Sequence, residues 1–129
     1  MSTTATATDT RATLALARRF EASFNRHDVD AIMADMTGDC VFEIVAPADK
    51  GGGRWEGQAA VRAVWEALEE WFPGYRFETE DLFACGDRCT YRWLLRFSPP
   101  SGSKEAIRGV DVYTIRDGQI ARKFTYFTH

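Results

Sequence analysis

The sequence lacks most of the features that mark a specialised class of protein. It has only three cysteines, Cys40, Cys85 and Cys89, and their spacing matches neither a zinc site nor a thioredoxin motif. An odd number of cysteines indicates reduced thiols and a cytoplasmic protein, while Cys85 and Cys89 flank a tight turn and could instead pair with each other. No cluster of histidines, cysteines and carboxylates predicts a metal, and no cofactor motif is present.

Long hydrophobic runs and a bias toward one charge are also missing. No run approaches the roughly 20 apolar residues that span a bilayer, and residues 1–10 lack the basic and apolar regions of a signal peptide. We therefore expect no membrane contact and interpret residues 1–9 as a disordered tail. The net charge is only −3, with Lys and Arg interleaved with acids, so nucleic acid is not an expected partner.

What remains is the composition of an ordinary globular domain. Of the 129 residues, 45% are hydrophobic and 27% are charged, and a domain of this length forms a core without disulfides or metals. Residues 10–129 are therefore predicted to form a single domain. Aromatic residues are somewhat abundant, with nine Phe, four Trp and four Tyr. Large rings fill cores, but they also line pockets for apolar ligands.

Hydrophobic periodicity predicts three helices and five strands. The helices are expected at residues 9–25, 29–37 and 58–71, with Asp28 as the N-cap of the second. The strands are expected at residues 40–45, 75–84, 88–97, 105–115 and 119–127. The resulting order, α-α-β-α-β-β-β-β, predicts an α+β fold in which the helices lie on one face of a curved antiparallel sheet.

Alternation within the central strands singles out Asp111. Residues 88–97 and 105–115 each place apolar side chains on one face, and Asp111 is the only acid on those faces. A carboxylate there either serves as an acid or base toward a ligand carbonyl, or pairs with a tyrosine or a cation such as Lys123 for structural reasons. Lys123 lies on the last strand, where periodicity leaves open whether it is buried or solvated.

Three segments resemble proteins of one superfamily. Residues 25–31, 55–61 and 109–120 are similar, in that order, to the first helix junction, the start of the third helix and the last hairpin of SnoaL-like or nuclear-transport-factor-2-like proteins. The resemblance covers nearly the whole chain after the tail. It implies a cone-shaped domain around one apolar pocket, and a homodimer formed through the outer face of the sheet. The relatives include ketosteroid isomerases, polyketide cyclases and non-catalytic binding proteins.

The residues of ketosteroid isomerase are only partly retained. The resemblance places its catalytic base at Ile44, its oxyanion-hole tyrosine at Phe20 and its protonated aspartate at Asp111. Only Asp111 keeps the required side chain, so steroid isomerisation by that mechanism is not expected.

Two other enzymes of the superfamily match less well. The Arg-Asp pair of limonene epoxide hydrolase corresponds to Trp93 and Leu95, and its other aspartate corresponds to Thr125. Scytalone dehydratase uses pocket histidines, whereas the histidines here are His27, at a helix junction, and the terminal His129. The broad SnoaL-like group remains the best resemblance.

We therefore expect one pocket between the helices and the concave sheet face, with Asp111 as the catalytic acid or base. The residues expected around it are Phe20, Phe24, Phe42, Ile44, Trp65, Tyr91, Trp93, Tyr113, Lys123 and Phe127. The expected function is cofactor-free isomerisation, cyclisation or dehydration of a small carbonyl compound. The alternative is a non-catalytic module of the same fold that binds a ligand or mediates dimerisation.

Overall fold

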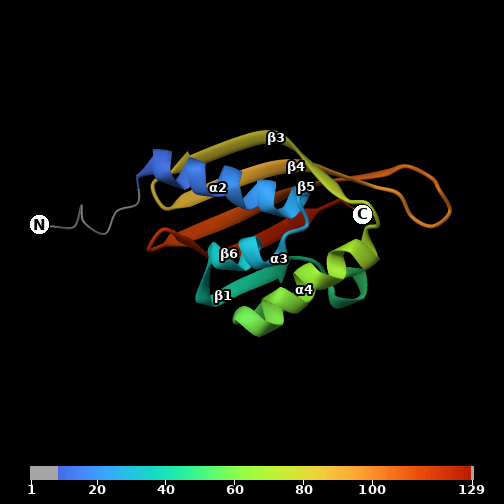
Figure 1. Cartoon of the computed structure of the whole chain (residues 1–129), viewed down its shortest axis with the longest axis horizontal. Coiled ribbons are helices and arrows are strands. Elements are labelled where there is room, and N and C mark those ends of the chain that lie inside the picture. Colours follow the sequence, from blue (N-terminus) through green and yellow to red (C-terminus); the bar gives the residue numbers. More distant parts are fainter. Residues whose placement is uncertain (1–8, 129) are drawn as a thin grey trace, which may run out of the picture.

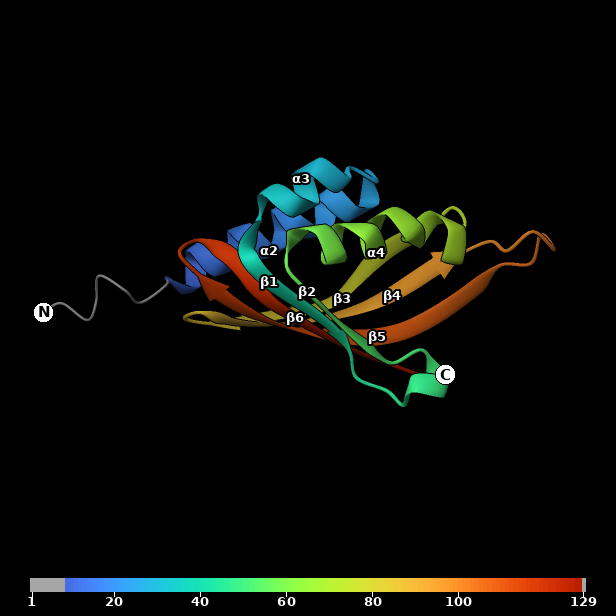
Figure 2. The ribbon, with the colours of Figure 1, turned by 90° about the horizontal axis from the view of Figure 1, so that it is seen from below.

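The computed structural model describes residues 9–128 as a curved six-stranded sheet with three helices on one face (Figures 1 and 2). The helical segments are α2 (Thr10–Asn25), α3 (Val29–Ala34), the 3-10 turn η1 (Ala48–Lys50) and α4 (Gln58–Trp71). The strands are β1 (Met36–Ile44), β2 (Gly53–Glu56), β3 (Arg76–Cys85), β4 (Arg88–Phe97), β5 (Glu105–Arg116) and β6 (Gln119–Phe127). The predicted tail, apart from Asp9, and His129 lie outside the described residues.

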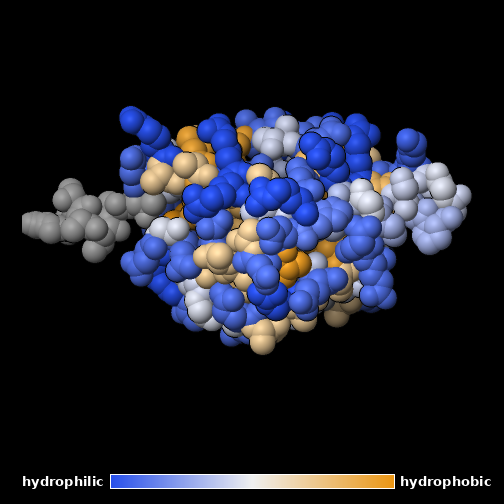
Figure 3. All heavy atoms as spheres, in the orientation of Figure 1, coloured by the Kyte–Doolittle hydropathy of each residue, from blue (hydrophilic) through white to orange (hydrophobic). Residues whose placement is uncertain are grey.

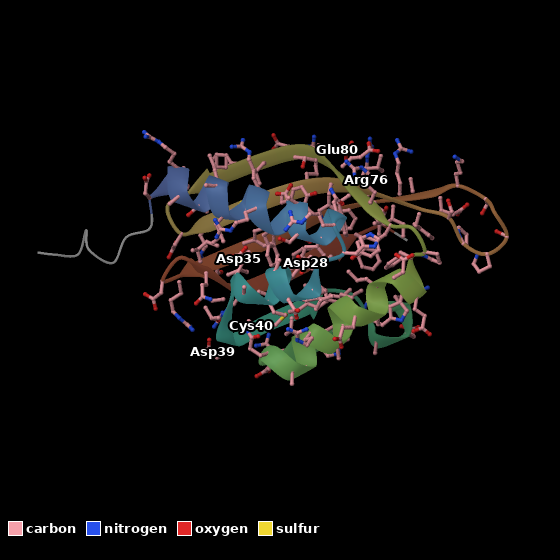
Figure 4. The ribbon with its side chains drawn as sticks, viewed as in Figure 1. Asp28, Asp35, Asp39, Cys40, Arg76 and Glu80 are labelled. Carbon is pink, nitrogen blue, oxygen red and sulfur yellow. The ribbon has the colours of Figure 1, made fainter. Side chains whose placement is uncertain are left out.

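The helices begin where the sequence predicts them. The Asp9 side chain accepts a hydrogen bond from the Arg11 amide at the start of α2. Asp28, which lies at the start of α3 (Figure 4), accepts one from the Ala31 amide. Helix α3 ends at Ala34, however, three residues before the predicted end. Among the described helices, none is long and apolar enough to cross a membrane.

The early end of α3 follows from the pairing of β1. Met36 already pairs with Ile120 of β6, and the Gln58 side chain donates a hydrogen bond to the Met36 carbonyl. These long-range bonds hold Met36 in the sheet, although its spacing fits the buried stripe of the preceding helix. Gly38 therefore lies within a strand and does not terminate a helix.

The sheet order is β2-β1-β6-β5-β4-β3. Strands β1 and β6 pair in parallel, whereas the other neighbours are antiparallel as expected, so the curved sheet is mixed. Strand β2 was missed because it begins at the last of three consecutive glycines, a run typical of a loop. It pairs with β1 and places Trp55 beside Phe42. The predicted α+β architecture with three helices on one face is otherwise confirmed.

The core lies between the helices and the concave face of the sheet. In β4 the predicted alternation is observed: Cys89, Tyr91, Trp93 and Leu95 are buried, and their neighbours are more exposed. The helices contribute Phe20, Ile32 and Val61 at full burial. The outer surface of the helical side is mostly hydrophilic (Figure 3), which agrees with amphipathic helices that bury their apolar stripes.

Gly109 of β5 marks a close approach in this core. A Cβ at this position would lie 2.3 Å from ring atoms of Trp93, its partner on β4. Because no side chain stands there, the Trp93 indole can lie flat across the neighbouring strand.

We expect Gly109→Ala to destabilise the protein by roughly 1–3 kcal/mol, because the added methyl group overpacks the Trp93 ring. Gly38→Ala is the matched control, since nothing lies within 4 Å of a Cβ built there, and its effect should stay within about 0.5 kcal/mol. Urea denaturation of the two variants measures both values. Equal stability of both variants would contradict this account of Gly109.

The outer face of the sheet carries exposed apolar side chains beside ion pairs. Phe83 is 59% exposed and Tyr126 is also exposed, while Arg96 and Arg108 pair with Glu78 and Glu80 of β3. A surface that mixes apolar and charged groups in this way suits a moderately polar interface.

We therefore expect a homodimer formed through this outer face. Light scattering at micromolar concentration should give about twice the monomer mass. Tyr126→Glu places a charge in the interface and should yield a folded monomer. A monomer mass for the unaltered protein at every concentration would refute the dimer.

Candidate functional site

A cavity of about 380 Å³ lies between α4 and the concave face of the sheet. Its wall is almost entirely apolar. The lining residues are Phe24, Phe42, Ile44, Gly51, Gly52, Trp55, Val64, Trp65, Leu68, Trp71, Phe72, Phe77, Trp93, Leu95, Ile107, Lys123, Thr125 and Phe127. Trp71 is 48% exposed, so we place the mouth of the cavity beside it, at the end of α4.

Lys123 is the only ionisable side chain among the described residues that line this cavity. Its Nζ lies 4.7 Å from the ring centroid of Phe42, 5.3 Å from Trp65 and 5.7 Å from Phe24. Aromatic faces attract a cation at these distances. Burial lowers the pKa of Lys123, whereas the charge of Asp111 and its hydrogen bond oppose that shift.

Asp111 anchors the lysine from the sheet. Lys123 Nζ lies 3.1 Å from Asp111 Oδ2, and the Tyr113 hydroxyl donates to the same oxygen at 3.3 Å. Thr125 Oγ1 donates to Asp111 Oδ1 at 2.7 Å and accepts from Lys123 Nζ at 3.0 Å. Asp111 is only 3% exposed, and a buried charge without partners would destabilise the fold. The three donors to its carboxylate compensate for the lost hydration.

Asp111 itself does not line the cavity. It lies behind Lys123 and Thr125, which both do, so any ligand meets these two side chains first. The structure therefore contains the ion pair with Lys123 that the sequence left open. The expected contact between Asp111 and a ligand stays a prediction, and Lys123 and Thr125, which both contact the Asp111 carboxylate, stand between it and this cavity.

Most of the residues expected around the pocket border this cavity: Phe24, Phe42, Ile44, Trp65, Trp93, Lys123 and Phe127. Phe20, Tyr91 and Tyr113 do not, which corrects their predicted placement. Phe20 packs edge-on against Phe24 at 5.0 Å and Tyr113 at 5.6 Å. The reason is that α2 packs directly on the sheet, whereas the cavity lies under α4.

Sequence reasoning missed Glu21, a buried carboxyl on α2. Glu21 is only 8% exposed, and Thr79 Oγ1 donates a hydrogen bond to its Oε1 at 2.8 Å. Burial raises the pKa of Glu21 to about 7, the charge of Asp111 adds to the rise, and polar contacts from Thr79 and Tyr91 oppose it. The spacing could have revealed it, because Glu21 follows buried Ala17 by four positions and precedes buried Phe24 by three.

His27 and the three cysteines do not border the cavity. His27 adopts a positive φ of 56° at the helix junction, where its ring stacks on Tyr75 and its Nε2 donates to the Tyr75 carbonyl at 2.9 Å. Cys40, Cys85 and Cys89 are free thiols. No group of three or more possible metal ligands occurs within residues 9–128.

The fold agrees with comparisons to known proteins. Residues 17–123 match the family model of the SnoaL-like domain. The chain therefore belongs to the SnoaL-like family, as the three sequence segments indicated. A search of the curated proteins found no match.

Solved structures show the same fold. A nuclear-transport-factor-2-like protein of unknown function from Mesorhizobium loti is 32% identical, with 93% of each chain covered and a TM-score of 0.76. TerC, crystallised with polyporic acid, is 21% identical over 91% of this chain and 92% of its own, with a TM-score of 0.80. A protein of Xanthomonas campestris, provisionally described as a polyketide cyclase, is 21% identical over 92% of each chain, with a TM-score of 0.74.

We expect Asp111→Asn to destabilise the protein by roughly 3–5 kcal/mol, because it leaves the charge of Lys123 buried without its partner. The double variant Asp111→Asn/Lys123→Met removes both charges and should recover most of that loss. Chemical denaturation of the wild type, both single variants and the double variant gives the coupling energy. Additive effects would show that the pair contributes nothing to the fold.

Proposed function

We propose that this protein binds a small, apolar carbonyl compound and promotes proton transfer on it without a cofactor. In this proposal, the ligand oxygen lies against Lys123, and the aromatic wall holds the rest of the ligand. The reaction class is isomerisation or cyclisation through an enolate. The observation that carries the proposal is a single buried ammonium group in an otherwise apolar cavity.

The size of the cavity supports a small-molecule ligand. About 380 Å³ falls within the range of roughly 300–1,000 Å³ typical of ligand sites, which are mostly apolar with a few polar groups. The rings of Phe42, Trp55 and Trp65 favour a flat or aromatic ligand, because they offer large rigid faces.

The hydrogen bonds of Lys123 support the contact with a ligand oxygen. An ammonium group carries three donors, and two of them are directed at Asp111 and Thr125. The third is available to an oxygen in the cavity. As a ketone loses a proton from the carbon next to its carbonyl to a water molecule or hydroxide in the cavity, it becomes an enolate and its oxygen gains charge. A fixed cation beside that oxygen therefore stabilises the enolate more than the ketone.

Asp111 has a positioning role in this scheme. It holds the ammonium group charged and fixed, so that no reorganisation is needed when charge develops on the ligand. Two relatives of the same fold agree with a small-molecule ligand: one is provisionally described as a polyketide cyclase, and another was crystallised with polyporic acid.

We expect the protein to bind 4-nitrophenol as the phenolate, an enolate mimic, with a shift of the phenol–phenolate equilibrium toward the coloured anion. Lys123→Met should weaken phenolate binding roughly 10- to 100-fold, the value of one hydrogen bond to a charged group. The double variant Asp111→Asn/Lys123→Met should bind as weakly, which covers the case in which the single variant does not fold. Lys104→Met, on an exposed loop, is the matched control and should bind like the wild type.

Catalysis is tested separately in deuterated water with 2-tetralone, an enolisable cyclic ketone fused to an aromatic ring. The protein should accelerate exchange at the carbon next to the carbonyl, as followed by proton NMR, and the Lys123 variants should lose roughly 100-fold of this acceleration. Binding of phenolate without any exchange would decide for the non-catalytic ligand-binding alternative. Absence of phenolate binding would refute the proposed site.

A further inference from the structure

A second, much smaller cavity lies beneath α2, and Lys123 borders both cavities. Its volume is about 10 Å³, and it is lined by Glu21, Phe24, Phe77, Tyr91, Asp111, Tyr113 and Lys123. A space of roughly this size accommodates one water molecule when two to four polar groups surround it. It joins the carboxyl of Glu21 to the ion pair of the main site.

Two polar atoms at this small cavity have no hydrogen-bond partner within residues 9–128. They are Oε2 of Glu21 and the hydroxyl oxygen of Tyr91, and both are inaccessible to solvent. The Tyr91 hydroxyl lies beside the Glu21 carboxyl but does not meet the geometry of a hydrogen bond to it. Buried polar atoms of this kind are rare in proteins, and an ordered water is the usual explanation.

Glu21 is also poised to exchange a proton, since burial raises its pKa to about 7. The polar and titratable groups that face it come from five elements. They are Arg18 on its own helix α2, Thr79 on β3, Cys89 and Tyr91 on β4, Asp111 and Tyr113 on β5, and Lys123 on β6. Of these, Lys123 and Arg18 carry positive charge, and Lys123 is already paired with Asp111.

We propose that a water molecule held by Glu21, Tyr91 and Asp111 links the two carboxyl groups, and that Glu21 stores the proton which a hydroxyl or enol ligand loses in the main cavity. Glu21 is then a positioning residue that acts through Asp111, without touching the ligand. This inference rests on the proposed function for its ligand, but the water-linked pair of carboxyls stands without it.

In this proposal, the proton moves from the ligand to Glu21 through Thr125, Asp111 and the water molecule. The ligand O–H bond breaks and its proton passes to Thr125 Oγ1, while the Thr125 hydroxyl proton passes to Oδ1 of Asp111. The water then carries a proton from Asp111 to Oε2 of Glu21. The electron pair stays on the ligand oxygen beside Lys123. The site thus holds one net negative charge before and after the transfer, which avoids an additional buried charge.

Proton linkage with 4-nitrophenol tests the inference. At about pH 8, Glu21 and the free probe are both mostly ionised, and the bound phenolate places a second negative charge near Glu21, which favours its protonation. Calorimetry in buffers with different heats of ionisation should therefore show uptake of close to one proton per bound phenolate. Glu21→Gln should bind the probe with almost no proton uptake.

Glu80→Gln is the matched control, because it makes the same change on β3 (Figure 4). There, Glu80 pairs with Arg108 on the outer face of the sheet. It should take up protons like the wild type. Equal uptake by the wild type and Glu21→Gln, or no uptake by a wild type that binds the probe, would overturn the role of Glu21.

A ligand-free measurement separates this inference from the proposed function. In protein labelled with ¹³C at glutamate carboxyls, one resonance should titrate near pH 7 and be absent from Glu21→Gln. In Asp111→Asn, or in Asp111→Asn/Lys123→Met if the single variant does not fold, its midpoint should fall, because the charge of Asp111 raises the pKa of Glu21. A midpoint unchanged in these variants would refute the link between the carboxyls, whether or not any phenolate binds.

Discussion

The buried ion pair between Lys123 and Asp111 is the constraint around which the cavity-bearing half of this domain is arranged. Two charges inside an apolar core are tolerated only when hydrogen bonds and Coulomb attraction compensate for the lost hydration. Here β5 and β6 supply the compensation together, since Tyr113 and Thr125 both donate to the Asp111 carboxylate. The aromatic rings over the ammonium complete its surroundings. The geometry of this pair therefore depends on the register between the last two strands.

Helices α2 and α4 pack differently on the sheet, so that one half of the domain is closely packed and the other half contains a cavity. Helix α2 packs closely over β3, with Phe20 and Glu21 buried beneath it. Helix α4 lies over the other half, where the curved sheet leaves the aromatic cavity. Lys123 stands at the boundary between the packed and the open half. The same side chain can therefore contact a ligand on one side and a buried carboxyl network on the other.

Strand periodicity was sufficient to predict the fold class and to place Asp111 on the buried face. Features that depend on contacts between distant segments could not be predicted. The parallel pairing of β1 with β6, the short strand β2 and the early end of α3 are all set by long-range hydrogen bonds. The site was predicted in part for the same reason. The aromatic wall of the cavity follows from periodicity. The position of Asp111 behind Lys123 depends on which of these two side chains, on adjacent strands, extends further toward the cavity. Glu21 was missed because a charged residue beside two arginines is typical of an exposed helix face.

The charge count of the buried residues explains why two carboxyls accompany one lysine. Lys123 and Asp111 alone form a neutral pair, and an anionic ligand would then add a buried charge without compensation. With Glu21 ionised, the site already holds one excess negative charge at the small cavity, and protonation of Glu21 offsets the charge of a bound anion. Because the pKa of Glu21 is raised to about 7, its proton is exchanged at little free-energy cost at neutral pH. The same burial that makes Glu21 unfavourable for the fold makes it suitable as a proton store, and this favours a functional origin for a carboxyl that a purely structural core would replace with an apolar side chain.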